Sequence, residues 1–268
     1  MPPISFPAHR TRVSAETRDT ALPWRLCLLM ALAVAPIPLL AQDRTYTGDG
    51  YFFNRPAVSL TLRGGYDRAL GGSDIYDFTT TNLTLNKGDF AAFGYQVDLG
   101  IRLSNRSEFV FSGGAARRAA RSQFRKYVDN NDLPIEQTTA LRRLPLSVGV
   151  KYALTSPETR ISRFAWIPAR IVPWIGAGAG AMNYTFAQKG DFVDFQTLNV
   201  IRQDYSSSGW APLGYGNVGL DLRLTTRLSL TGDVRYTYSK ATLSGSFQGF
   251  DKIDLSGTAA TMGFTVRM

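Results

Sequence analysis

The sequence predicts an all-β fold: a single closed antiparallel transmembrane β-barrel of eight strands, with long external loops and short periplasmic turns. Short runs with an apolar residue at every second position recur from Val58 to Met268. The intervening positions carry Gly, Ser, Thr, Asp and Arg. Period two places these two sets of side chains on opposite faces of a strand. One face is therefore apolar and the other is polar, as expected for a barrel with lipid outside and a polar interior.

The first 41 residues differ from the rest. Four arginines precede an apolar run over 26–35, and small Ala41 follows shortly before a polar segment. This order indicates a secretory signal peptide over 1–41, cleaved after Ala41. The run is too short to span a bilayer as a helix. We assign 42–55 to an N-terminal periplasmic segment and 56–268 to an outer-membrane β-barrel.

Eight alternating runs account for the barrel. They cover residues 57–68, 93–104, 107–119, 140–154, 171–186, 211–224, 227–240 and 254–268. In the seventh run, Leu228 and Val234 lie opposite Asp233 and Arg235. In the fifth run, the alternation does not show which residues face inward. Its glycines indicate either space for a bulky interior neighbour or a sharp corner of the barrel.

The connections between these runs alternate in length, as an outer-membrane barrel requires. In chain order they cover 69–92, 105–106, 120–139, 155–170, 187–210, 225–226 and 241–253. The link over 155–170 fits this order least well, since it is of medium length and contains prolines. Pro145, Pro173 and Pro212 fall inside or near strands, and we expect each at a strand end or a bulge.

The alternation does not by itself say which face meets lipid. A soluble lipocalin-like barrel, with an apolar pocket inside, is the competing all-β class. Lipid outside is favoured by glycines on the charged face, by strands of about ten residues, and by aromatic residues expected near both membrane interfaces. These aromatic residues are Tyr66, Tyr95, Tyr184, Trp210, Tyr236 and Tyr238 at the external end, and Phe109, Tyr152 and Trp166 at the periplasmic end.

Charged residues on the polar face are expected to point into the barrel. They are Arg63, Asp67, Asp98, Arg102, Glu108, Lys151, Asp221, Arg223, Asp233, Arg235 and Arg267. They could line a conduit or form a paired network that fills a narrow interior. We favour the network, because isolated buried charges are costly and an eight-stranded barrel has little free bore.

The chain after the predicted signal peptide contains neither cysteine nor histidine, because Cys27 and His9 both precede position 42. Disulfides, thiol nucleophiles and histidine bases are therefore excluded from it. No zinc, phosphate-loop or nucleophile-elbow motif occurs. We predict no enzyme, no catalytic, cofactor or metal site, and, despite a net charge of +9, no nucleic-acid binding, since the strand charges alternate in sign.

Two features stand out in the expected external loops. The segment 74–83 shares its Asp, Phe, Thr and Asn spacing with 191–200. These segments could be binding fingers or, as we favour, short capped turns across the barrel mouth. A second feature is a basic cluster, which forms either a solvated rim or a binding surface for lipid phosphates. It consists of Arg117, Arg118, Arg121, Arg125 and Lys126.

The closing run 255–268 resembles the terminal β-signal read by the barrel-assembly machinery, and 173–180 resembles the proline, aromatic and glycine strand of small barrels. From about Pro56 the chain is thus similar to the eight-stranded outer-membrane barrels of the OmpA, OmpX and OmpW type. It departs from them by ending in Met268 rather than Phe or Trp. The resemblance implies location in the cell outer membrane, contact with outer-membrane lipid and lipopolysaccharide, and insertion by the barrel-assembly machinery.

We therefore expect a structural or surface-interaction role carried by the external loops, with an external ligand that the sequence does not identify. A narrow pore for small solutes is the alternative. A soluble periplasmic barrel that binds an apolar ligand is a third interpretation.

Overall fold

The computed structural model describes residues 55–268, apart from 130–131, 163–164, 195–196 and 198. The predicted signal peptide and nearly all of the segment 42–55 lie outside the described residues.

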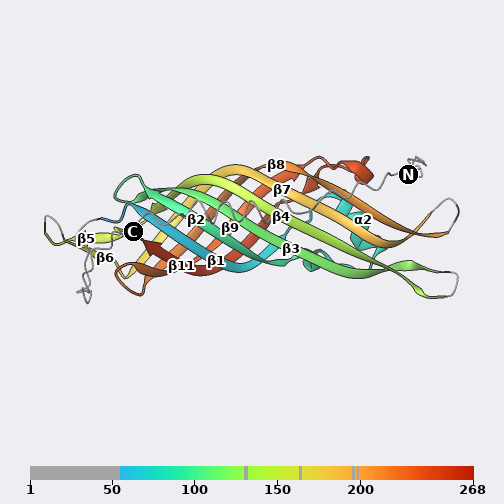
Figure 1. The fold of residues 1–268 in the computed structure, drawn as a ribbon, viewed down its shortest axis with the longest axis horizontal. Helices are drawn as coiled ribbons and strands as arrows, with labels where there is room; N and C mark the ends of the chain where they lie inside the picture. The colour runs from blue at the N-terminus through green and yellow to red at the C-terminus, as the bar shows by residue number, and fades with distance from the viewer. Residues whose placement is uncertain (1–54, 130–131, 163–164, 195–196, 198) are drawn as a thin grey trace, which may run out of the picture. The chain divides into compact units, whose positions relative to one another are not determined.

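Eight strands pair in an antiparallel ring (Figure 1). They are β1 (Val58–Ala69), β2 (Ala92–Arg102), β3 (Ser107–Val128), β4 (Pro134–Ala153), β7 (Ile171–Val193), β8 (Val200–Arg223), β9 (Leu228–Ala241) and β11 (Gly257–Arg267). Each strand pairs with the next one in this order. The last strand, β11, pairs with both β9 and β1, so the sheet closes on itself. The predicted closed eight-stranded barrel is confirmed.

The apolar face of the ring points outward, as predicted. Val97, Val148 and Val234 are 46%, 43% and 55% exposed. On β4 the outward apolar positions run from Leu144 to Tyr152, which is about 27 Å of strand. At a tilt of about 40° this run spans roughly 20 Å, close to the roughly 25 Å apolar band of transmembrane barrels.

One end of the ring carries the tight connections and Met268, and we call it the turn end. In two of these turns a hydroxyl accepts a backbone N–H, a common way to stabilise a turn. Ser104 accepts the N–H of Ser107 at 3.1 Å, and Thr225 accepts the N–H of Leu228 at 3.0 Å. The link predicted over 155–170 contains a small hairpin of β5 (Glu158–Arg160) and β6 (Trp166–Pro168).

At the opposite end, the loop end, four strands are much longer than expected. The strands β3, β4, β7 and β8 have 22, 20, 23 and 24 residues. Most of the loops predicted over 120–139 and 187–210 are therefore strand. The alternation weakens there because polar residues occupy both faces, while backbone pairing continues to Val193–Val200.

The other loop-end connections fold into the barrel mouth. The connection from β1 to β2 contains the helix α2 (Asp74–Asn82) and the short helix η1 (Lys87–Phe90). The connection from β9 to β11 contains η2 (Gly245–Phe247) and the two-residue strand β10 (Ile253–Asp254). Their buried side chains join those of the strands in one apolar cluster.

Exposed aromatic residues occupy the outer face near the ends of the ring strands, but two expectations were wrong. Tyr66, Tyr95 and Trp210 are 57%, 64% and 61% exposed. Tyr184, however, points inward and is buried, because inward positions of β7 have even numbers. Trp166 lies in β6, outside the ring of strands.

The prolines also depart in part from expectation. Pro145 lies inside β4, opposite Met182 of β7. On the other side, β4 is unpaired with β3 between the pairs Gly113–Leu146 and Ala116–Arg143, and the register is the same before and after this gap. Pro145 is therefore accommodated by a short gap in one ladder rather than by a strand end or a bulge.

Candidate functional site

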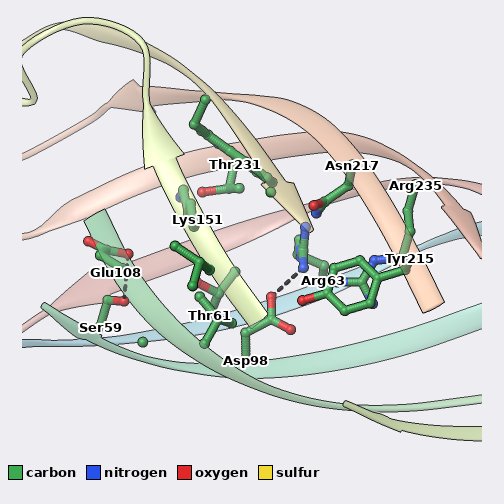
Figure 2. A pocket seen from close by; sticks show the side chains of 15 residues that line it. Ser59, Thr61, Arg63, Asp98, Glu108, Lys151, Tyr215, Asn217, Thr231 and Arg235 are labelled. Atoms are coloured by element: carbon green, nitrogen blue, oxygen red, sulfur yellow. Dashed lines mark hydrogen bonds and ion pairs between the residues drawn. The ribbon is translucent and has the colours of Figure 1, made fainter. Parts of the chain in front are cut away.

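The interior of the ring holds a first polar group, the Arg63 cluster (Arg63, Asp98, Tyr215, Asp233, Arg235), of which Figure 2 labels all but Asp233. Arg63 is 3% exposed and forms ion pairs with Asp98 of β2 and, at 2.7 Å, with Asp233 of β9. The guanidinium of Arg235 lies 4.1 Å from the centre of the Tyr215 ring. This cluster connects β1, β2, β8 and β9 across the interior.

Glycines on β4 and β7 make room for Tyr215. A Cβ on Gly149 would lie 2.4 Å from the Tyr215 hydroxyl, and one on Gly178 would lie 2.7 Å from its ring. Both positions would also meet backbone atoms of the neighbouring strand. The glycines of the fifth predicted strand therefore leave space for a bulky interior neighbour, the first of the two interpretations of that strand.

A second group, the Asp221 cluster (Lys151, Trp174, Asp221, Thr231, Arg267), lies nearer the turn end. Asp221 accepts hydrogen bonds from Lys151 at 2.9 Å and Arg267 at 2.8 Å. Its other oxygen accepts from the indole of Trp174 at 2.9 Å and from Thr231 at 3.0 Å. One carboxylate is thus bonded by two cations and two neutral donors, which compensates for its burial.

At the turn end, the β5–β6 hairpin joins the interior network. Glu158 of β5 is buried and lies 2.8 Å from Arg55 and 2.7 Å from Arg102. Arg55 also stacks on Trp166, with its guanidinium 3.6 Å from the ring centre. Sequence reasoning missed Glu158, because it lies in the link over 155–170, for which no strand was predicted.

The structure places all eleven predicted charges on the inner face of the ring, and ion pairs engage most of them. Sequence reasoning did not select Arg143, which pairs with Asp67 at 3.0 Å. Its position opposite the apolar face of β4 was the available signal. The arrangement is a paired network of opposite charges.

The space left between these side chains is small. A cavity of about 30 Å³ borders both clusters, and another of about 20 Å³ lies toward the turn end. A single buried water needs roughly 10–15 Å³, so each cavity has the size of one or a few waters. Side chains therefore fill the bore at these levels.

The loop end is filled by apolar side chains, which we call the plug. Tyr76 of α2 packs edge-on against Phe90 of η1 and Phe186 of β7, with ring centres 5.0 and 6.2 Å apart. Phe247 of η2 lies 5.3 Å from Phe186. Burial raises the pKa of the Tyr76 phenol well above its ordinary value, so this side chain is neutral inside the plug.

The two segments with matching spacing do not form matching structures. Asp74 opens α2, where Ser73 holds the N-cap position and makes no side-chain cap. Asp191 instead continues β7 and pairs with Arg202 of β8. Residues 195–196 and 198 of the second segment lie outside the described residues. The hypothesis of two equivalent capped turns is therefore wrong.

The basic cluster predicted at the start of an external loop lies within β3. Arg118 donates to the carbonyl of Asp89 at 3.3 Å, and Arg125 donates to that of Leu83 at 2.6 Å. Arg117 and Arg121 are exposed on the outer face of the strand. The cluster thus divides into members that hold the η1 connection and members that face outward.

Within the described part of the chain, no helix has the length and apolar character needed to cross a membrane. The same residues contain no group of three or more metal-binding side chains placed to hold an ion.

No protein-family model and no curated protein matches the chain. Its structure is similar to that of Neisserial surface protein A, with 10% identity, 82% of this chain and 97% of that chain covered, and a TM-score of 0.45. It is also similar to that of the outer membrane protein OprG from Pseudomonas aeruginosa, with 14% identity, 81% of this chain and 99% of that chain covered, and a TM-score of 0.42. A third similar structure is Ail of Yersinia pestis in complex with the heparin analogue sucrose octasulfate. Here the identity is 12%, 78% of this chain and 99% of that chain are covered, and the TM-score is 0.37. At such values the fold assignment rests on the strand pairing of this chain itself.

A closed antiparallel ring with an apolar outer face, exposed aromatic residues near its ends and a charged interior defines a transmembrane β-barrel of the outer-membrane class. More particularly, the protein is an eight-stranded barrel with a filled interior. This is the architecture that the resemblance to the OmpA, OmpX and OmpW type implies.

Proposed function

We propose that this chain is an integral protein of the bacterial outer membrane whose barrel is a rigid, non-conducting anchor for a surface-interaction role at the loop end. The observation that carries this proposal is the continuation of β3, β4, β7 and β8 beyond the other ring strands. Long connections of such barrels face the outside of the cell. The four-stranded extension would therefore project from the surface as a paired, ordered sheet.

The filled interior supports an anchor rather than the alternative of a narrow pore. The Arg63 and Asp221 clusters occupy the bore at membrane level, and the plug occupies the loop end. Opening a path through these layers would separate buried ion pairs, which is costly. The proposed role involves no catalysis.

The apolar outer face weighs against a soluble periplasmic barrel. Large apolar residues are exposed on every strand of the ring. Among them, Leu62, Phe93 and Met262 are about as exposed as Trp210. So much exposed apolar surface on one continuous wall is typical of contact with lipid.

The proposal includes a route to the membrane. The segment 1–41 would direct export, and β11 would be read by the barrel-assembly machinery. Cleavage after Ala41 would leave Gln42 as the first residue. Amino-terminal sequencing of the protein purified from envelopes tests this step, and retention of residues before Gln42 would contradict it.

Location and conduction can be tested with the same preparation. We expect the protein in the outer-membrane fraction, extracted by detergent alone, with heat-modifiable migration on a gel. Reconstituted into planar bilayers, it should show no discrete conductance. Recovery in the soluble periplasmic fraction would refute the membrane location, and reproducible conductance steps would restore the pore.

The surface role is tested on intact cells. Protease added outside should cut at the loop end, near Asp129, Asp132, Asp194 and Asn199 at the strand ends, because backbone pairing protects the strands themselves. Cleavage at the turn-end segments around Arg106 or Arg227 in intact cells would mean that the orientation is reversed.

A further inference from the structure

Three arginines on the outer face of β3 and β4 form what we call the arginine patch: Arg117, Arg121 and Arg142. Arg117 and Arg142 are direct cross-strand partners. Both occupy outward positions, since inward neighbours Ala116 and Arg143 are buried. Like charges directly opposite each other on one face destabilise a strand pair. An anionic group between the two side chains would therefore stabilise the pair.

The described residues supply no such group. No carboxylate among them lies within 4.0 Å of Arg117, Arg121 or Arg142, whereas nearby Lys189 pairs with Asp204 at 2.9 Å. Inside the barrel, by contrast, Arg63 and Arg143 each have an acidic partner. The patch is thus an outward-facing concentration of positive charge next to well-paired neighbours.

The position of the patch along the strands points to its partner. On β4, Arg142 is the first charged outward residue beyond the apolar run that ends at Leu144. On β3, Arg117 follows Phe111 and Ala115 on the same face. Next to Arg117, the exposed rings of Phe93 and Tyr95 pack edge-on with centres 5.1 Å apart. Aromatic residues mark the membrane interface, so the arginines lie at the depth of lipid headgroups.

We propose that the arginine patch binds phosphate groups of the phosphorylated glycolipid in the outer leaflet. Guanidinium groups bind phosphate oxygens in pairs of parallel, charge-assisted hydrogen bonds. A phosphate between Arg117 and Arg142 would replace their repulsion by attraction to a shared anion. Arg121 lies further along the same face, and the intervening pair is Ala119–Ala140, whose small side chains leave room for a headgroup.

This inference rests on the proposed function, because it needs the barrel in a membrane with its loop end outward. It adds the chemical class of one partner and the residues that bind it. Orientation in the outer membrane is tested by the fractionation and proteolysis described above. The inference is tested with purified protein, so the two can fail separately.

The test compares two double variants with the same change in charge. Arg117→Gln/Arg142→Gln removes the cross-strand pair. The matched control, Arg106→Gln/Arg227→Gln, removes two exposed arginines from the turn end. Each protein is refolded in phosphatidylcholine vesicles, its folding is checked by heat-modifiable migration, and its binding of fluorescent lipid A with both phosphates is measured. Lipid A without phosphates and phosphatidylglycerol serve as competitors.

We expect Arg117→Gln/Arg142→Gln to weaken binding of phosphorylated lipid A by roughly tenfold to a hundredfold, and the control to bind like the natural protein. Without lipid A, the patch variant should unfold at the same temperature as the natural protein or at a higher one, because it loses a like-charge pair. With lipid A, the order should reverse. Arg117→Lys/Arg142→Lys should bind with intermediate affinity, because lysine retains charge without the paired geometry.

Unchanged binding by the patch variant, or equal weakening by the control, would overturn the proposal. Competition by phosphatidylglycerol as strong as that by phosphorylated lipid A would overturn the assignment to the glycolipid. Should the double variant fail to refold, Arg142→Gln alone gives the same test, and binding equal to that of the natural protein would again refute it.

Discussion

Replacing Arg63 by methionine tests whether the interior is a paired network. Methionine keeps much of the side-chain volume and removes the cation that joins Asp98 and Asp233. Both carboxylates would remain buried, hydrogen-bonded by neutral donors such as Gln96 at 2.7 Å and Asn217 at 3.0 Å, with Arg235 as the one cation left in the cluster. Removing one partner of a buried ion pair costs about 3–5 kcal/mol, and we expect a loss of this size in the free energy of unfolding.

A second substitution separates charge from packing. Adding Asp98→Asn to Arg63→Met leaves one carboxylate without its Arg63 partner instead of two. The double variant should regain roughly 0.5–3 kcal/mol, the range of coupling energies between residues in contact. Arg227→Met, in an exposed turn, should change stability by no more than about 0.5 kcal/mol.

The assay is reversible urea unfolding in vesicles, followed by tryptophan fluorescence and by heat-modifiable migration. Trp174 reports on the interior, since it is buried and bonded to Asp221. The slope of free energy against urea should stay constant, so that differences reflect stability alone. A cost below about 1 kcal/mol for Arg63→Met, or a double variant no more stable than the single one, would refute the network.

Three further outcomes are expected. Burial raises the pKa of Tyr76, so the stability due to its neutral phenol is complete below about pH 10. Above that pH, the free energy of unfolding should fall by up to about 1.4 kcal/mol per pH unit. Unfolding measured from about pH 9 to 11 should show a smaller alkaline loss for Tyr76→Phe. Gly219→Ala places a Cβ 2.3 Å from the ring of Trp174, so it should reduce the free energy of unfolding by about 1–3 kcal/mol and alter the tryptophan emission. Gly214→Ala, whose Cβ would have no atom within 4 Å, should change neither. Phe247→Ala removes a buried ring from the plug and should cost about 3–5 kcal/mol, with faster proteolysis of the 242–252 connection; unchanged proteolysis would mean that the plug does not hold this connection.

The sequence was sufficient to predict the ring and its faces, because one physical constraint acts on every strand. Lipid-facing positions must be apolar, so the alternation survives wherever a strand crosses the membrane. In β9, for example, Val234 and Asp233 take the predicted sides. Outside the membrane this constraint ends. The residues 187–193 have polar side chains on both faces, and only their pairing with 200–206 of β8 identifies them as strand.

The partners inside the barrel were beyond the reach of the sequence for a different reason. Period two gives the face of Arg63 but not the strands that bring Asp98 and Asp233 to it. Glu158 enters the turn end from a hairpin, and no periodicity marks it. The helix in the plug was missed because α2 has nine residues, three of them consecutive threonines, a composition that favours strands over helices.

The length of β3 leaves part of its backbone without a neighbour. Pairing with β2 stops at Ala116, and beyond that point the only backbone pairing on this side within the described residues is a short contact of Leu83 and Thr84 with Phe124 and Gln123. A bare strand edge invites a second copy of the protein to add on and start an aggregate. Arg117 and Arg121 face outward along this stretch, and a strand of the same sequence would have to bring its own two arginines against them. Mutual repulsion therefore helps to keep each barrel separate in a crowded membrane.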